Sequence, residues 1–136
     1  MNIQQLHEKV ENVVVAVVPE ENPQPGTLPE WYVYLINLRP EPLEGVIVSS
    51  KGYGELEGKE IKTSVLRQFI DKLPEYSFIK LEWIEPKLFG ITNEFWVSYY
   101  QHGRIFDKQY VFVTDSIIQD NFSEVPLLEK RGVVIR

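Results

Sequence analysis

A glycine-rich segment between Ser49 and Ser64 holds the residues that come closest to an anion-binding site in this chain. It carries several lysines and ends in two adjacent hydroxyl residues. The apolar pattern after it predicts a helix, and the first turn of a helix has free backbone N–H groups and a positive dipole end. We therefore expect that a phosphate or carboxylate can bind at the helix start, through the candidate ligand-binding residues Lys59, Lys62, Thr63 and Ser64.

The same segment has a plainer interpretation. Thr63 or Ser64 can cap the helix without any ligand, which is the usual role of such residues at that position. Three glutamates, Glu55, Glu57 and Glu60, also offset the positive charge of the lysines. The sequence leaves both interpretations open, with capping the more common of the two.

Two phosphate-binding motifs fail to match this loop. The GxxxxGK[ST] motif needs four residues between its glycines, but only three lie between Gly54 and Gly58. Lys59 is then followed by Glu60 where Ser or Thr is required. The GxGxxG motif fails at Glu57, which stands in place of the third glycine. The loop therefore supports neither a nucleoside triphosphatase nor a dinucleotide site, and we expect no cofactor.

A β-hairpin is the second feature that can present functional side chains. Its arms run over residues 94–101 and 104–114, and the two-residue turn His102–Gly103 fixes which residues lie opposite each other. One face is expected to be core: Phe95, Val97, Tyr99, Phe106, Tyr110 and Phe112. The other face mixes aromatic and polar side chains, and there we expect an interaction surface formed by Trp96, Tyr100 and Ile105. A second copy of the chain is one candidate to cover it.

Catalytic triads and metal sites find no support in the spacing of residues. Ser98 and Asp107 lie opposite each other, but His102 is four residues further along, about 13 Å away at roughly 3.3 Å per residue. A triad needs hydrogen-bond contact between its members. His7 and His102 have no partner at the spacing of a metal ligand, so we expect no metal site. Because 20 acidic residues always permit some pairing, an acid–base enzyme stays open as a third hypothesis.

Composition narrows the class of protein. A chain of 136 residues fits a single domain over residues 1–136. The formal net charge of −6 argues against a general nucleic-acid binder, which needs a dense Lys and Arg surface. The absence of cysteine excludes disulfides, thiolate ligands and a cysteine nucleophile. No apolar run is long enough to cross a bilayer and no signal core is present, so we expect no membrane partner and a cytoplasmic location.

These features must be positioned by the elements that the apolar patterns predict. We expect an α+β domain with a mainly antiparallel sheet of about six strands and one central helix. The helix is predicted to begin at Thr63 or Ser64 and to end at Pro74, because the apolar residues between them recur at helical spacing: Val65, Leu66, Phe69, Ile70 and Leu73. Ile3, Leu6 and Val10 predict a short N-terminal helix in the same way.

Apolar runs and alternation with a period of two predict the strands outside the hairpin. Residues 13–18 are an uninterrupted β-branched run typical of a buried strand, residues 31–39 alternate with both sides largely apolar, and residues 46–48 form a short apolar strand. In the strand over residues 77–85, one face is expected to carry Ile79, Leu81 and Trp83, and the other Lys80 and Glu82.

Taken together, these patterns favour a non-enzymatic protein-interaction or assembly module. Its surface is expected around Trp96, Tyr100 and Ile105, with a protein partner or a second copy in a homodimer. The alternative is a small-molecule protein or enzyme that binds phosphate or carboxylate at residues 51–64.

Overall fold

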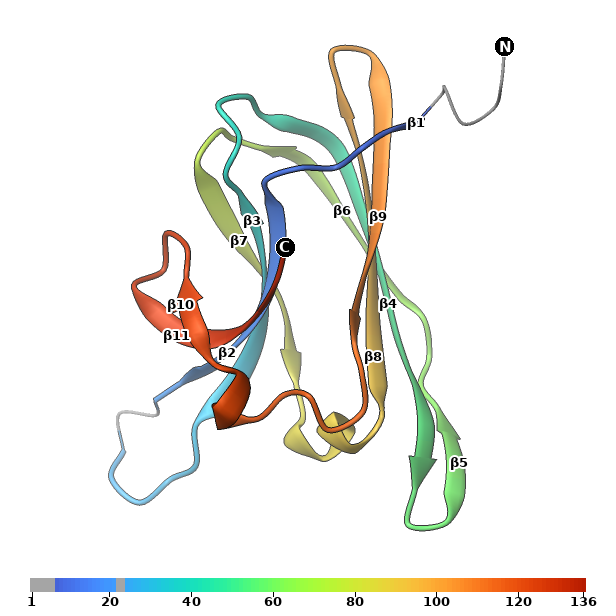
Figure 1. Ribbon diagram of the computed structural model, residues 1–136, viewed down its shortest axis with the longest axis vertical. Helices are drawn as coiled ribbons and strands as arrows, with labels where there is room; N and C mark the ends of the chain where they lie inside the picture. The colour runs from blue at the N-terminus through green and yellow to red at the C-terminus, as the bar shows by residue number, and fades with distance from the viewer. Residues whose placement is uncertain (1–6, 22–23) are drawn as a thin grey trace.

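The computed structural model describes residues 7–21 and 24–136, which form two facing β-sheets (Figure 1). The first sheet has the strand order β1-β9-β8-β4-β5. Strand β6 also pairs with β4, along residues 43–50, whereas β5 pairs with residues 53–56. The strands of this first sheet are β1 (His7–Glu8), β4 (Leu43–Leu56), β5 (Lys59–Lys62), β6 (Leu66–Leu73), β8 (Thr92–Gln101) and β9 (Arg104–Phe112). The second sheet has the order β10-β11-β2-β3-β7. Its strands are β2 (Val13–Glu20), β3 (Glu30–Asn37), β7 (Ser77–Ile84), β10 (Ser123–Val125) and β11 (Lys130–Ile135).

The chain alternates between hairpins within one sheet and crossings to the other. Hairpins join β2 to β3, β4 to β5, β8 to β9 and β10 to β11. The crossings follow β1, β3, β6, β7 and β9, and the crossing after β7 contains the short 3-10 helix η2 (Pro86–Gly90). A second 3-10 helix, η3 (Gln119–Asn121), precedes β10. In Figure 1, η2 lies at the lower end of the molecule, between the ends of the two sheets.

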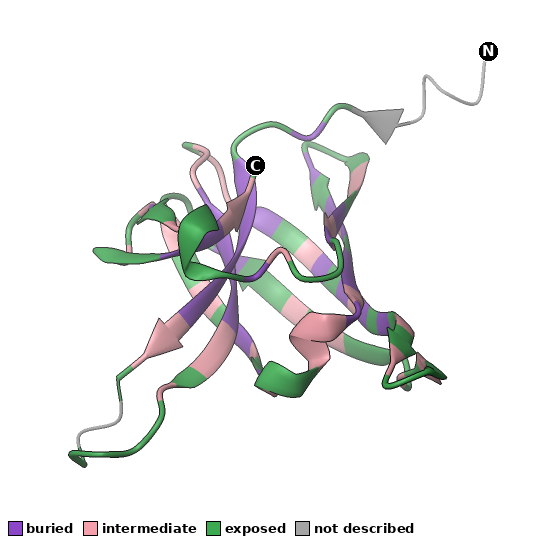
Figure 2. Cartoon of the chain, turned by 60° about the horizontal axis from the view of Figure 1, so that its bottom comes forward, coloured by how far each residue is buried: buried purple, intermediate pink, exposed green. Residues whose placement is uncertain are grey.

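The main core lies between the sheets. The strands of both sheets carry buried stretches, drawn in purple in Figure 2. The buried residues of this core include Val15 and Leu35 of the second sheet and Val48 and Phe95 of the first. Tyr110 of the first sheet ties the layers together, because its hydroxyl donates a 2.6 Å hydrogen bond to the carbonyl oxygen of Val13 in the second.

The outer face of the second sheet carries a separate apolar cluster. Val14, Ala16 and Val18 of β2 pack there with Val125 and the half-buried Leu128 of the β10–β11 hairpin. Strand β2 is therefore buried on both faces, which explains its uninterrupted apolar sequence from Val13 to Val18.

The expected α+β class is wrong. The described residues contain no helix of seven or more residues, and the protein is nearly all β. The segment predicted as the central helix is instead the strand β6, which pairs antiparallel with β4 from Leu43↔Leu73 to Ser50↔Leu66. The long strand β4 has an edge that needs a partner along its whole length, and β5 and β6 supply that partner in succession. Tertiary pairing therefore overrides the helical spacing of the apolar residues.

The predicted N-terminal helix is not seen where the structure can test it. Ile3 and Leu6 lie outside the described residues. His7–Glu8 form β1, a short strand that pairs parallel with β9.

The predicted hairpin is confirmed together with its register. Strands β8 and β9 pair antiparallel, with Tyr100 opposite Ile105 and Trp96 opposite Gln109. Its turn is made by His102 and Gly103, both with positive φ, of 52° and 71°. Two residues of this kind match the right-handed twist of the strands they join. The predicted strands over residues 13–18, 31–39 and 77–85 are also present, as β2, β3 and β7.

Candidate functional site

The outer face of the first sheet carries an unusual set of exposed apolar side chains. Phe69 of β6 and Ile47 of β4 lie directly opposite each other, and Ile47 in turn lies opposite Ser98 of β8. Trp96 and Tyr100 flank Ser98 along β8. We call this set the outer apolar face: Ile47, Phe69, Trp96, Tyr100 and Ile105. Their exposed fractions range from 37% for Ile105 to 67% for Phe69.

All three residues predicted as an interaction surface belong to this face. Trp96 is 47% exposed and Tyr100 is 49% exposed. The Tyr100 ring lies against β4, and a Cβ atom at Gly45 would meet its Cδ2 at 3.3 Å. The sequence patterns did not indicate Ile47 and Phe69 as surface residues, because they place Ile47 in a short apolar strand and Phe69 in the apolar set of a helix.

Two opposite charges border the same face. Arg67 and Asp71 are exposed, on β6, and lie two residues before and two residues after Phe69. Ser49 lies opposite Arg67 on one side and Trp96 on the other, so Arg67 and Trp96 belong to the same row across the sheet. Neither Arg67 nor Asp71 forms an ion pair in the part of the chain that the structure describes.

The helix start predicted to bind an anion does not exist, so no helix dipole can act there. Lys59 and Lys62 lie on β5, opposite Leu56 and Tyr53 of β4. The four predicted residues do not converge on one site. Lys62 borders a hollow with Tyr53, whereas Thr63 and Ser64 line a different cavity.

Hydrogen bonds within the strands already use the Thr63 side chain. Its Oγ1 accepts a 2.7 Å hydrogen bond from the Gly52 backbone N–H and donates one of 3.2 Å to the carbonyl oxygen of Ser64. The Thr63 backbone N–H donates to the Gly52 carbonyl oxygen at 2.9 Å. Thr63 thus extends the β4–β5 hairpin by one residue pair. Anion binding by the four residues stays a prediction without its original physical basis.

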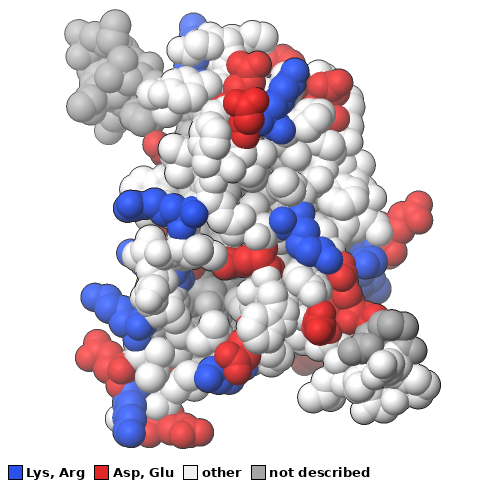
Figure 3. All heavy atoms as spheres, turned by 180° about the vertical axis from the view of Figure 1, so that it is seen from behind, with Lys and Arg blue, Asp and Glu red and all other residues white. Residues whose placement is uncertain are grey.

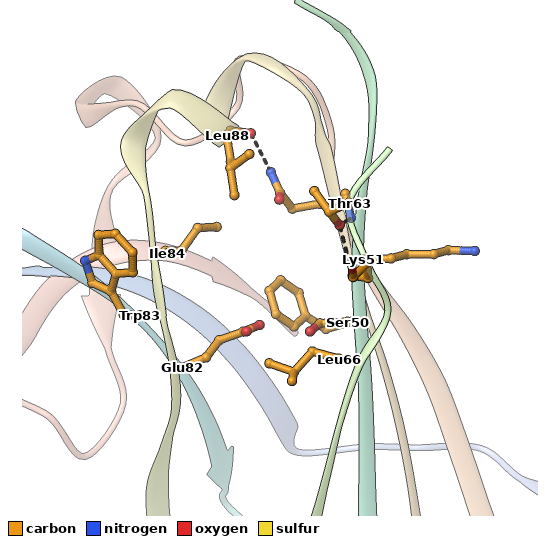
Figure 4. A pocket seen from close by; sticks show the side chains of 12 residues that line it. Ser50, Lys51, Thr63, Leu66, Glu82, Trp83, Ile84 and Leu88 are labelled. Carbon is orange, nitrogen blue, oxygen red and sulfur yellow. Dashed lines mark hydrogen bonds between the residues drawn. The ribbon is translucent and has the colours of Figure 1, made fainter. Parts of the chain in front are cut away.

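The cavity lined by Thr63 and Ser64 lies between the two sheets (Figure 4). Its volume is about 160 Å³. Apolar side chains form much of its wall: Leu66, Ile84, Leu88 and Phe95. At the end of the cavity formed by η2, the Asn93 amide nitrogen donates a 2.8 Å hydrogen bond to the Leu88 carbonyl oxygen and so joins β8 to η2.

A β-bulge turns the carboxylate of Glu82 into this cavity. Val33 of β3 lies opposite Glu82 and the next residue, Tyr34, lies opposite Lys80, so Leu81 is an extra residue on β7. Such an insertion re-aims the side chains that follow it. Figure 4 shows Glu82 and Ile84 pointing into the cavity, while the Trp83 ring lies on the opposite side of β7.

Sequence alternation therefore predicted the wrong faces beyond the bulge. Trp83 was expected to share a face with Ile79 and Leu81, but it is 55% exposed, whereas the other two pack in or against the main core. Glu82 was expected on the outside with Lys80. The sequence does contain a sign of the bulge. Leu81 and Ile84 are both apolar, but they are three positions apart, and regular alternation would put them on opposite faces.

Burial raises the pKa of the Glu82 carboxyl group above its ordinary value, and a hydrogen bond from Ser50 lowers it only in part. Glu20 on β2 shows the opposite balance. Burial acts to raise its pKa, but hydrogen bonds from Tyr34, Lys80 and Lys130 outweigh burial and lower it. Lys80 and Lys130 approach the Glu20 oxygens at 3.0 and 3.3 Å. Of these two acids, Glu82 is the one without a cationic partner among the described residues.

The other expectations about catalysis and metals can be compared with the same geometry. Ser98 and Asp107 are cross-strand neighbours as expected, whereas His102 lies at the exposed hairpin turn, beside Glu41. Among the described residues, no three His, Cys, Asp or Glu side chains gather where they could hold a metal ion.

Charge is dispersed on the face of the molecule seen in Figure 3, where Lys and Arg alternate with Asp and Glu and form no continuous basic patch. The expectation that the protein does not bind nucleic acid stays a prediction. The described residues include no helix with the length and apolar character needed to cross a membrane.

Comparisons of the sequence with protein families and with curated proteins suggest no function for this chain. No protein-family model matches the chain, and no curated protein matches it in sequence.

Proposed function

We propose that this protein is a non-enzymatic assembly module that associates with a second copy of itself through the outer apolar face. The observation that carries this proposal is the exposure of five large apolar side chains on one side of a single sheet. Contiguous apolar patches of this kind typically mark interaction sites. Trp, Tyr and Arg are also the residue types that contribute most to binding at protein interfaces.

The arrangement of charges favours a second copy as the partner. In a symmetric dimer, each surface must be complementary to itself. Consider a two-fold axis that runs across the strands along the row Phe69, Ile47 and Ser98. Residues equally far before and after that row then face each other between the two copies.

Two pairs satisfy this condition at once. Arg67 and Asp71 lie two residues on either side of Phe69, so each arginine would face an aspartate of the other copy. Trp96 and Tyr100 lie two residues on either side of Ser98, so each indole would face a phenol ring. Because the pairings Phe69↔Ile47 and Ile47↔Ser98 place these residues in one row, a single axis serves both pairs.

The anion-binding alternative has weaker support. It depended on the positive end of a helix, and the segment is a pair of strands. The residues named for it also border different hollows.

Light scattering coupled to size-exclusion chromatography tests the proposal. We expect the wild-type protein to elute as a dimer at micromolar concentrations, and the variant Trp96→Ser with Tyr100→Ser to elute as a monomer. Both side chains are half exposed, so the variant is expected to keep its fold, which circular dichroism checks. Phe78→Ser is the matched control, because Phe78 is equally exposed but belongs to the second sheet. A wild-type monomer across the concentration range, or a double variant that stays dimeric, contradicts the proposal.

A further inference from the structure

The position of Glu82 in the cavity depends on the β-bulge in strand β7. Strand β7 contains one residue more than β3 needs for regular pairing, and that insertion brings the carboxylate inside. An unbulged strand would leave Glu82 on the solvent side with Lys80. Bulges occur preferentially at sheet edges, where β7 lies, and next to functional sites, where they re-aim a side chain.

Glu82 is poorly compensated in this position. Glu82 is half-buried, and a carboxylate withdrawn from water is destabilising to the extent that it is neither paired nor hydrogen-bonded. The Ser50 hydroxyl offsets the effect of burial on the pKa of Glu82 only in part, and no Lys, Arg or His of the described residues forms an ion pair with Glu82. Lys51, the other charged residue that lines the cavity, points away from it in Figure 4 and pairs with Glu94 at 3.6 Å.

We infer that the cavity binds a small organic cation, a protonated amine whose ammonium group pairs with Glu82 and whose hydrocarbon part packs against the apolar wall. The ammonium group supplies the positive charge and hydrogen-bond donors that the protein does not. Leu66, Ile84, Leu88 and Phe95 supply the apolar contact.

The size of the cavity sets the size of the ligand. Its volume of about 160 Å³ is close to that of an engineered cavity of about 150 Å³ that takes up benzene. An amine with one six-membered ring or a chain of similar bulk therefore fits. The cavity is partly open, so that such a ligand can enter from solvent.

The same electrostatics disfavour the other ligand classes. A phosphate or carboxylate would meet the carboxylate of Glu82, while the ammonium group of Lys51 is directed elsewhere. A metal ion would find a single carboxylate, since no cluster of three ligating groups occurs in the described part of the chain.

Calorimetric titration with benzylamine as the probe tests the inference, with benzyl alcohol and benzoate as neutral and anionic probes of similar shape. We expect benzylamine to bind at least about tenfold more tightly than benzyl alcohol, and benzoate not to bind. The variant Glu82→Gln keeps the shape of the side chain and removes the charge, so we expect it to lose at least about tenfold in affinity for benzylamine. Glu85→Gln is the matched control, because Glu85 is a neighbouring carboxylate that does not line the cavity.

Two further measurements keep the test independent of the fold of the variant. Amide resonances of Ser50, Leu66 and Leu88 are expected to shift on titration of the wild-type protein. Binding is also expected to weaken as the pH falls through the raised pKa of Glu82, because the carboxylate is then protonated while the amine stays charged. Equal affinities for benzylamine and benzyl alcohol, full affinity of Glu82→Gln, or shifts confined to another surface would each overturn the inference. So would the absence of binding by all three probes.

Discussion

At the scale of single residues, the insertion of Leu81 into β7 determines which side chains of that strand face the interior. Up to Leu81 the alternation of β7 follows its sequence, and beyond Leu81 every side chain changes face. A sequence pattern shows which residues alternate, but the site of a bulge depends on where the partner strand β3 stops matching. The carboxylate of Glu82 and the exposed Trp83 both follow from this single shift.

We expect Glu82→Gln to be more stable than the wild-type protein at neutral pH, by an amount that disappears in acid. Burial raises the pKa of Glu82 in the folded state, so between the ordinary value of 4.5 and the raised value the folded protein holds a proton that the unfolded chain has lost. The free energy of unfolding of the wild-type protein therefore falls as the pH rises through this window. Glutamine does not titrate and shows no such fall.

Urea denaturation of both proteins across a pH series measures this difference, with Glu85→Gln as the control. A difference between Glu82→Gln and wild type that is the same at every pH would show that burial does not perturb Glu82.

At the scale of the elements, β6 shows how a helical pattern can belong to a strand. Its apolar residues satisfy helical spacing, yet Ile70 packs against the core while Phe69 lies 67% exposed on the opposite face. Strand β4 spans 14 residues, longer than β5 can pair, so the following segment completes the edge. The sequence of residues 63–73 does not itself show that this segment pairs with β4, because the unpaired edge belongs to a strand that ends before the segment begins.

This placement changes the expected cost of removing Phe69. A helix that buried the ring would lose about 3–5 kcal/mol on Phe69→Ala. Because the ring is exposed, we expect a change of less than about 1 kcal/mol in the free energy of unfolding. Leu43→Ala on the neighbouring strand is the comparison, since Leu43 is fully buried and its loss should cost about 2–5 kcal/mol.

Denaturant titrations at a protein concentration that keeps the chain monomeric measure both values. A loss at Phe69 as large as that at Leu43 would mean that the ring is buried in the monomer. The outer apolar face would then lose one of its members.

At the scale of the whole molecule, the second sheet was the larger omission. Most strands could be predicted from alternation, and the β8–β9 hairpin could be predicted with its register because a two-residue turn fixes it. The layering could not, because the crossings after β1, β3, β6, β7 and β9 look like ordinary turns in sequence. The apolar run of β2 is typical of a strand that is buried on both faces. Its outer face is covered by the β10–β11 hairpin, which lies far away in the sequence.

The same difference in scale separates the two candidate sites. Trp96, Tyr100 and Ile105 belong to one hairpin, so their common face could be predicted from local sequence. Ile47, Phe69 and the Glu82 cavity depend on contacts between strands far apart in the chain.

A charge swap on β6 tests the central claim most directly. If two copies meet about the row of Phe69, then Arg67→Asp alone and Asp71→Arg alone each place like charges opposite one another and weaken the dimer. The combined variant restores opposite charges with the same composition as the wild-type protein.

Sedimentation equilibrium of the wild type, both single variants and the combined variant provides the measurement. We expect the single variants to dissociate at concentrations at which the wild type is dimeric, and the combined variant to recover most of the lost affinity. A dimer that both single variants leave unchanged, or a combined variant no tighter than either single one, would contradict self-association about this axis.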